Sequence, residues 1–127
     1  PELGRDALSQ ELEAARDRNV RLQLARALLD ERTALAERVL WELLGSDDMV
    51  SVQAAATLAE RGDEHATELL LATLDSPASS LVRQVAARAL ARRADQPVEL
   101  RPYFEDEDPI VRIHAAGGVL AATAERN

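Results

Sequence analysis

The chain has no cysteine and no lysine, and only three of its 127 residues are aromatic. Without cysteine it can form neither a disulfide nor a thiolate metal site. The scarcity of aromatic and β-branched residues disfavours a β-sheet, because strands are enriched in those residue types. No apolar run approaches the roughly 20 residues that a helix needs to cross a bilayer. The core must therefore be built from Leu, Ala and Val, a composition that favours helices.

All 15 basic residues are arginine, and they face 23 acidic residues, so the formal net charge is −8. An acidic chain repels phosphate groups, so neither a nucleic acid nor an anionic membrane is an expected partner. The sequence has no Gly-x-Ser-x-Gly nucleophile elbow and no glycine-rich phosphate loop. We therefore expect no catalytic site, no cofactor and no metal, and we interpret the chain as a binding module.

Four ten-residue segments align without gaps, and their first residues are 30, 32 and 29 positions apart. They begin at Val20, Val50, Val82 and Val111. Each has Val at the first position, Ala at the sixth and Leu or Val at the ninth, which places the three side chains on one helical face. A repeat of this length predicts a stack of similar helical units.

Each segment is preceded by a residue that can cap a helix N-terminus, three positions before the Val. These residues are Asp17, Asp47, Ser79 and Asp108. Upstream of each cap, an apolar stripe predicts a partner helix. The stripes are Leu8, Leu12 and Ala15; Leu40, Leu43 and Leu44; Leu70 and Leu74; and Leu100 and Phe104. Because Pro102 interrupts the last stripe, we expect a short or kinked element there.

The predicted fold is therefore all-α, an α-solenoid or α-α superhelix of four antiparallel helix pairs. It forms a single domain over residues 1–127, with units at about 5–30, 33–61, 64–93 and 96–124. Since the chain opens at Pro1 and not at Met, we expect it to be a segment of a longer protein.

The pattern Asp-x-x-Val-Arg-x-x-Ala-Ala-x-x-Leu is most complete at residues 79–90 and 108–119. It resembles the HEAT-like repeat family, whose repeats also occur in phycobilisome lyase subunits. The resemblance implies two helix layers, with the second helices lining a concave face, and a scaffold, adaptor or regulatory role. Some relatives handle bilin chromophores or damaged DNA bases, so an enzyme or enzyme subunit is the alternative. Ser51 departs from the pattern where Arg is expected, and Gly117 and Gly118 predict an interruption of the last inner helix.

The third and seventh positions of the inner helices form our candidate partner-binding face, because residues four apart project together. The candidate residues are Leu22, Arg26, Val52, Gln84, Arg88, Ile113 and, at its edge, His114. The third-position side chains would give a partly exposed apolar groove flanked by arginines, suited to a protein, a peptide or another domain of the same chain. Alternatively, the third-position side chains are buried between neighbouring inner helices. A structural spacer in a larger protein is a further alternative.

Three second-position arginines, Arg21, Arg83 and Arg112, form either an anion-binding ladder or ion pairs. The family resemblance favours pairing with acids of adjacent turns, here Asp47, Asp48 or Asp106. The acidic run at residues 105–108 has no Gly for a calcium loop, so we interpret it as a solvated turn that ends in an N-cap.

The two histidines, His65 and His114, are forty-nine residues apart, and we expect surface or structural roles for both. Trp41 is expected to pack between outer helices of consecutive units. Near the C-terminus, Gly117 with Ala121 and Gly118 with Ala122 form small i,i+4 pairs. They indicate a docking face for the rest of a longer chain, a face for a second copy, or a frayed end.

Overall fold

The computed structural model describes residues 2–46, 48–92 and 100–126, with side chains described for 6–46, 48–92 and 100–117. The described residues contain helices and turns but no strand, which confirms the all-α prediction. The helices are α1 (Glu2–Ala14), α2 (Arg18–Leu28), α3 (Thr33–Glu42), α4 (Met49–Glu60), α5 (Glu64–Leu74), α6 (Ser80–Ala91), the 3-10 helix η1 (Arg101–Tyr103) and α7 (Pro109–Arg126).

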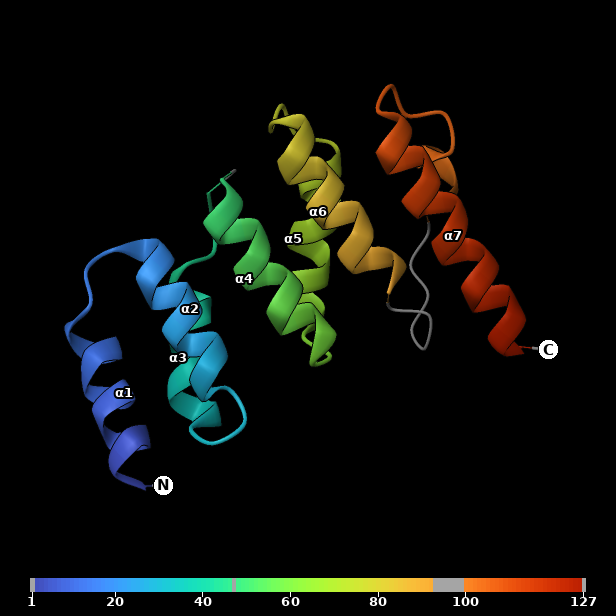
Figure 1. Ribbon diagram of the computed structural model, residues 1–127. Helices are drawn as coiled ribbons and strands as arrows, with labels where there is room; N and C mark the ends of the chain where they lie inside the picture. The colour runs from blue at the N-terminus through green and yellow to red at the C-terminus, as the bar shows by residue number, and fades with distance from the viewer. Residues whose placement is uncertain (1, 47, 93–99, 127) are drawn as a thin grey trace.

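The helices follow one another along an elongated stack, with the chain termini towards opposite ends (Figure 1). Helices α2, α4, α6 and α7 lie side by side and form the inner layer, whereas α3 and α5 lie behind them. Helix α4 packs against both α5 and α6, and α6 packs against α7. This sequential packing is the arrangement expected of an α-solenoid.

Side-chain caps begin most of the helices. The Asp17 carboxylate accepts a hydrogen bond from the Val20 N–H at 3.0 Å, and the Ser79 hydroxyl accepts one from the Val82 N–H at 3.3 Å. These bonds confirm the two predicted caps, since each satisfies an N–H that has no partner within the helix.

The predicted cap at Asp47 is wrong. Helix α4 is capped by Asp48, whose carboxylate accepts from the Ser51 N–H at 2.9 Å, while Asp47 lies outside the described residues. Asp48 adopts the extended conformation that an N-cap needs, with φ −103° and ψ 172°. It is also held by Arg18 of the preceding unit, at 2.6 Å. The cap therefore stands one residue closer to Val50 than in the other units.

Helix α4 ends in a Schellman motif centred on Gly62. The Asp63 N–H donates to the Leu58 carbonyl at 3.1 Å, and the Gly62 N–H donates to the Ala59 carbonyl at 3.0 Å. Gly62 has φ +91°, a left-handed conformation that is unfavourable for a residue with a Cβ. Glycine is thus required at this connection, and Asp63 then caps α5 through the Ala66 N–H at 2.9 Å.

The fourth unit has a short outer element, as Pro102 predicted. Its outer element is the 3-10 helix η1, which contains Pro102, and Leu100 beside it is buried whereas Phe104 is 39% exposed. The part of this unit before Leu100 lies outside the described residues. Helix α7 continues through Gly117 and Gly118, so the predicted interruption is wrong. A helix-interior glycine costs only about 1 kcal/mol relative to alanine, and buried Val111 and Ala115 hold this helix against its neighbours.

The core runs along the stack between the two layers. The sixth and ninth positions of the first three inner helices are at most 4% exposed: Ala25, Leu28, Ala55, Leu58, Ala87 and Leu90. At the two ends the same pattern is uncovered, because Val20 is 46% exposed and Ala116 is also exposed.

Candidate partner-binding surface

The expected apolar groove does not form at the first two units. Leu22 is fully buried and Val52 is 3% exposed, so neither side chain can contact a partner. Adjacent inner helices lie so close together that a third-position side chain points into the seam between them. The alternative reading, burial between neighbouring inner helices, is the right one for these two residues.

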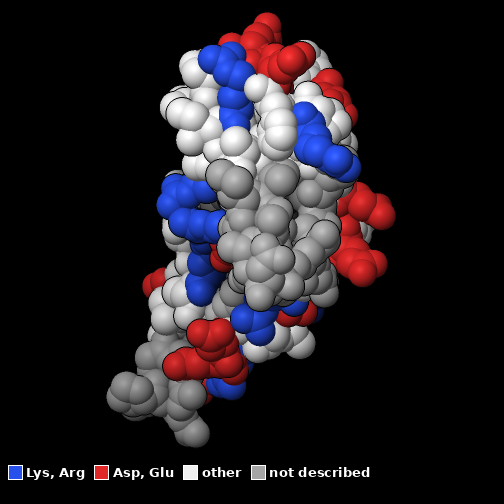
Figure 2. Space-filling view, turned by 90° about the vertical axis from the view of Figure 1, so that its right-hand side faces the viewer, with Lys and Arg blue, Asp and Glu red and all other residues white. Residues whose placement is uncertain are grey.

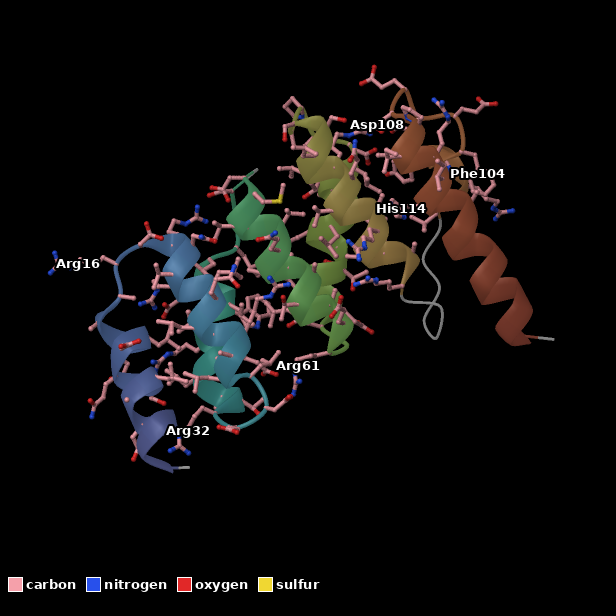
Figure 3. All side chains as sticks on the ribbon, viewed as in Figure 1. Arg16, Arg32, Arg61, Phe104, Asp108 and His114 are labelled. Carbon is pink, nitrogen blue, oxygen red and sulfur yellow. The ribbon has the colours of Figure 1, made fainter. Side chains whose placement is uncertain are left out.

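Gln84, the third-position residue of α6, also faces a seam. Its side-chain amide donates to the Ser80 hydroxyl at 3.1 Å and to the Asp108 carboxylate at 3.0 Å. Asp108 in turn caps α7, accepting from the Ile110 N–H at 2.8 Å, which confirms that predicted cap. Hydrogen bonds from Gln84 and Ser80 lower the pKa of Asp108 to about 2. Figure 3 shows Asp108 at the start of α7, beside α6. Gln84 therefore connects two units.

Arg83 forms the ion pair that was predicted for it. Its guanidinium binds both carboxylate oxygens of Asp106, one of them at 3.1 Å, and its Nε donates to the Leu74 carbonyl at 3.0 Å. The two side chains are only 11% and 9% exposed. The Arg83 guanidinium holds the pKa of Asp106 below its usual range. The pair joins unit three to unit four and leaves no free anion site at Arg83.

Arg21 and Arg112 are also engaged, but neither binds the carboxylate of a predicted aspartate. Arg21 donates to the carbonyls of Leu12 and Ala15, both at 2.9 Å, and pairs with Glu42 at 3.0 Å. Arg112 donates to the backbone carbonyl of Asp106 at 2.7 Å. In each case the guanidinium satisfies carbonyls at the end of the preceding helix or turn, so the interpretation as an anion-binding ladder is wrong.

Ser51 stands where the repeat pattern has arginine, and it accepts a hydrogen bond from an arginine of the preceding unit. Its hydroxyl donates to the Leu43 carbonyl at 2.6 Å. Arg18 donates to that hydroxyl at 3.0 Å, to the same carbonyl at 3.1 Å and to Asp48. This role of Arg18 could not be predicted from the sequence, because Ser51 lies 33 residues away.

The two seventh-position arginines, Arg26 and Arg88, do share one surface. They line a depression of about 250 Å³ between α2, α4 and α6, on the exposed side of the inner layer. Ala56 and Ala89 also line the depression. The prediction that these two arginines stand on one face agrees with this geometry.

Arg92 and Glu60 line the same depression, although the sequence analysis did not name them as candidate binding residues. They are the eleventh positions of adjacent inner helices, and their side chains lie 3.5 Å apart, each about half exposed. The signal for Arg92 was available, since it stands four residues after Arg88 and so on the same helical face. Gln53, also missed, completes the polar lining.

The last two candidate residues are on α7. Ile113 is 64% exposed, as the apolar-groove hypothesis required, but no described apolar third-position side chain accompanies it on the surface. His114 lies in the inner layer beside α6 (Figure 3). Burial, with smaller contributions from Arg88 and Arg92, lowers the pKa of His114. His114 is therefore close to the arginines of the depression.

The remaining sequence candidates lie elsewhere. The rings of Trp41 and His65 stack with centroids 5.1 Å apart, which confirms the predicted packing of Trp41 between the outer helices α3 and α5. Among the described residues, no group of three or more His, Cys, Asp or Glu side chains is arranged to hold a metal ion. The side chains of Gly118, Ala121 and Ala122 lie outside the described set, and at Gly117 an added Cβ would meet nothing within 4 Å.

Charge is distributed unevenly over the surface. Figure 2 views the stack from the end that carries α7, so the inner layer forms its left edge. Arginine side chains gather midway along this edge, whereas carboxylates are prominent at the top and on the opposite edge. Arginines thus gather midway along the inner layer, and carboxylates lie below them in this view.

Together, the stacked helix pairs, the polar seams and the hollowed inner layer define a short α-solenoid. None of its described helices is long and apolar enough to span a membrane. Residues 5–91 match the family model for HEAT repeats, which is about two thirds of the chain. The chain belongs to the HEAT repeat family, whose members generally act as scaffolds for protein interactions. It matches none of the curated proteins and none of the solved structures.

Proposed function

We propose that this HEAT repeat domain is a scaffold or adaptor that binds a protein partner, or another domain of its own chain, across the depression between α2, α4 and α6. One observation carries the proposal: Arg26 and Arg88, from two different units, are exposed and line one hollow. Arginine is enriched at protein interfaces, where its planar guanidinium binds polar groups in two directions at once.

The arginines differ in their contacts, and this difference supports the proposed location. The arginines at the seams, such as Arg83 and Arg18, are bound to carboxylates and carbonyls that join consecutive units. Replacing them would disturb the fold. Arg26 and Arg88 have no such structural partner among the described residues, so their side chains remain available to a ligand.

The proposal is tested by placing a photoreactive residue at Gln53, inside the depression, and separately at Glu68, on the exposed surface of α5. Irradiation in extract of the source cells is expected to give a discrete cross-linked protein from position 53 and none from position 68. Cross-linking from position 68 alone would place the binding surface on the outer layer and contradict the proposal. No adduct from either position would favour a structural spacer.

An enzyme or enzyme subunit of the chromophore-lyase or base-excision kind is the alternative that the lyase-type repeats suggest. Such an activity needs converging polar groups and, for DNA, a basic channel with aromatic stacking. The net charge of −8 and the scarcity of aromatic residues favour a binding module. Titration with duplex DNA at low salt separates the two readings, since tight and salt-sensitive binding would favour the enzyme.

A further inference from the structure

Half of the twelve arginines with described side chains form ion pairs with carboxylates. The pairs are Arg18 with Asp48, Arg21 with Glu42, Arg32 with Asp6, Arg61 with Asp30 and Glu37, Arg83 with Asp106, and Arg92 with Glu60. The other half includes exposed arginines that form no ion pair with a described carboxylate, although the chain has an excess of acids.

Arg26 and Arg88 are two such arginines, and they line the same depression. Within the part of the chain that the structure describes, neither guanidinium has an ion pair or a hydrogen bond. Both residues stand in the last turn of their helices, where a cation interacts favourably with the helix dipole. That effect accounts for a basic residue in each helix separately. It does not account for two arginines from different units that line the same hollow.

The local charge of the depression is the reverse of the charge of the whole protein. Three arginines and one glutamate line it, so its walls carry a formal charge of +2 against −8 for the chain. The single ion pair within it, Arg92 with Glu60, is about half exposed and 3.5 Å long. Exposed pairs of this kind contribute only about 0–1 kcal/mol. A ligand carboxylate can therefore compete for Arg92 as well.

The apolar residues that line the depression indicate the rest of the ligand. Ala56, Val85 and Ala89 line it with small apolar surface, against which short aliphatic side chains can pack. The hollow holds about 250 Å³, which suits a few side chains of a segment. A long polyanion such as DNA would extend beyond the hollow, where the net charge of −8 of the chain would repel it.

We infer that the depression binds an acidic segment of a protein, in which carboxylates alternate with small apolar side chains and pair with Arg26 and Arg88. This inference rests on the proposed function and names the chemistry of the partner. Carboxylates suit the site because each can accept two parallel hydrogen bonds from one guanidinium. The lowered pKa of His114, to which Arg88 and Arg92 contribute, is consistent with a positive potential there.

The inference is tested by fluorescence anisotropy with a labelled synthetic peptide in which Glu alternates with Ala. We expect the 127-residue chain to bind it, and to bind the matching Gln–Ala peptide at least about tenfold more weakly, since tenfold corresponds to about 1.4 kcal/mol. The double substitution Arg26→Gln with Arg88→Gln is expected to weaken binding of the Glu peptide by about tenfold or more. Added salt should weaken it too.

A matched control keeps the net charge equal. Arg16→Gln with Arg38→Gln also lowers the formal charge from −8 to −10. Arg16 extends into solvent at the far end of the stack (Figure 3), and Arg38 is exposed on α3. This control should bind the Glu peptide as the parent chain does, with unchanged circular dichroism in both double variants. If both double variants bound the Glu peptide equally weakly, the loss would be explained by net charge alone, and the inference would be overturned.

Other outcomes separate this inference from the proposed function. If the Glu peptide does not bind but position 53 still cross-links a partner, the acidic chemistry is wrong and the binding surface stands. If position 53 gives no adduct, the proposed function fails as well. Tighter binding of a DNA duplex than of the Glu peptide would overturn the inference in favour of a nucleic-acid partner.

Discussion

Helices α4 and α7 carry similar sequence patterns but bury them to very different extents. In α4, the residues from Ser51 to Ala59 are buried with the exception of Gln53. In α7, Val111 and Ala115 are buried, whereas Ile113 is 64% exposed. Helix α4 has an inner helix on each side, while α7 has one only on the side of α6 among the described residues. Burial in this fold therefore depends on the neighbouring units as well as on the pattern.

The first and third positions show which neighbour covers which residue. The first-position Val is 46% exposed at Val20, partly buried at Val50, and 4% and 0% exposed at Val82 and Val111, so it faces the preceding unit. The third position is buried at Leu22 and Val52 and exposed at Ile113, so it faces the following unit. Each end of the stack therefore exposes side chains that are buried between units elsewhere: Val20 at one end and Ile113 at the other.

The largest effect that this comparison predicts is on stability. Leu22→Ala should lower the free energy of unfolding by about 2–5 kcal/mol, because it opens a cavity in a packed seam. Ile113→Ala, at the equivalent position of α7, should change it by no more than about 0.5 kcal/mol. Urea denaturation followed by circular dichroism measures both. Similar losses in the two variants would mean that Ile113 is covered in solution.

A smaller effect on stability is expected when ion pairs are removed, and a pair between two units should matter more than a pair on the surface. Arg83→Ala should destabilise the fold by about 2–3 kcal/mol, because Arg83 and Asp106 are largely buried and doubly hydrogen-bonded. Arg61→Ala, which removes the exposed pairs with Asp30 and Glu37, should cost less than about 1 kcal/mol. Thermal unfolding of both variants provides the measurement, and the reverse order would contradict the account.

The seam pair also predicts a pH dependence. Because Arg83 lowers the pKa of Asp106 in the folded state, the pair contributes its full stability above the unfolded carboxyl value of about 4. The contribution is lost as the pH falls through the lower, folded pKa. The difference in unfolding free energy between Arg83→Ala and the parent chain should therefore shrink in acid. A difference that stays constant would show that Arg83 does not lower the pKa of Asp106.

The smallest effects concern the glycines. Gly117→Ala should stabilise the chain by up to about 1 kcal/mol, because alanine favours a helix and the added Cβ meets no atom within 4 Å. Gly62→Ala should destabilise it by about 1 kcal/mol, because Gly62 has φ +91°. Melting temperatures give the two signs. Destabilisation by Gly117→Ala would indicate that something packs against that face in solution.

The fold was largely predictable because its determinants are local or periodic. The Val–Ala–Leu stripes define one helical face, and the caps Asp17, Ser79 and Asp108 accept hydrogen bonds from N–H groups three residues further along the chain. The choice between Asp47 and Asp48 was not predictable, since two adjacent aspartates satisfy the same pattern. A contact from Arg18, thirty residues earlier, holds the second of them.

The binding surface was predictable only in part. Arg26 and Arg88 could be placed on one face, because spacing determines which way a helical side chain points. The burial of Leu22 and Val52 could not be predicted, because spacing does not say how closely the next helix approaches. Arg92 could have been found from its position four residues after Arg88. Its partner Glu60 follows only once the register between α4 and α6 is known.

The most direct test of the stacking account is the accessibility of single introduced thiols, since the natural chain has no cysteine. Val52→Cys and Ile113→Cys place a thiol at the same position of two inner helices. Under native conditions, we predict that a thiol reagent modifies Ile113→Cys rapidly and modifies Val52→Cys only as fast as the protein unfolds. Rapid modification of Val52→Cys, or equal protection of both, would contradict the claim that consecutive units bury this position.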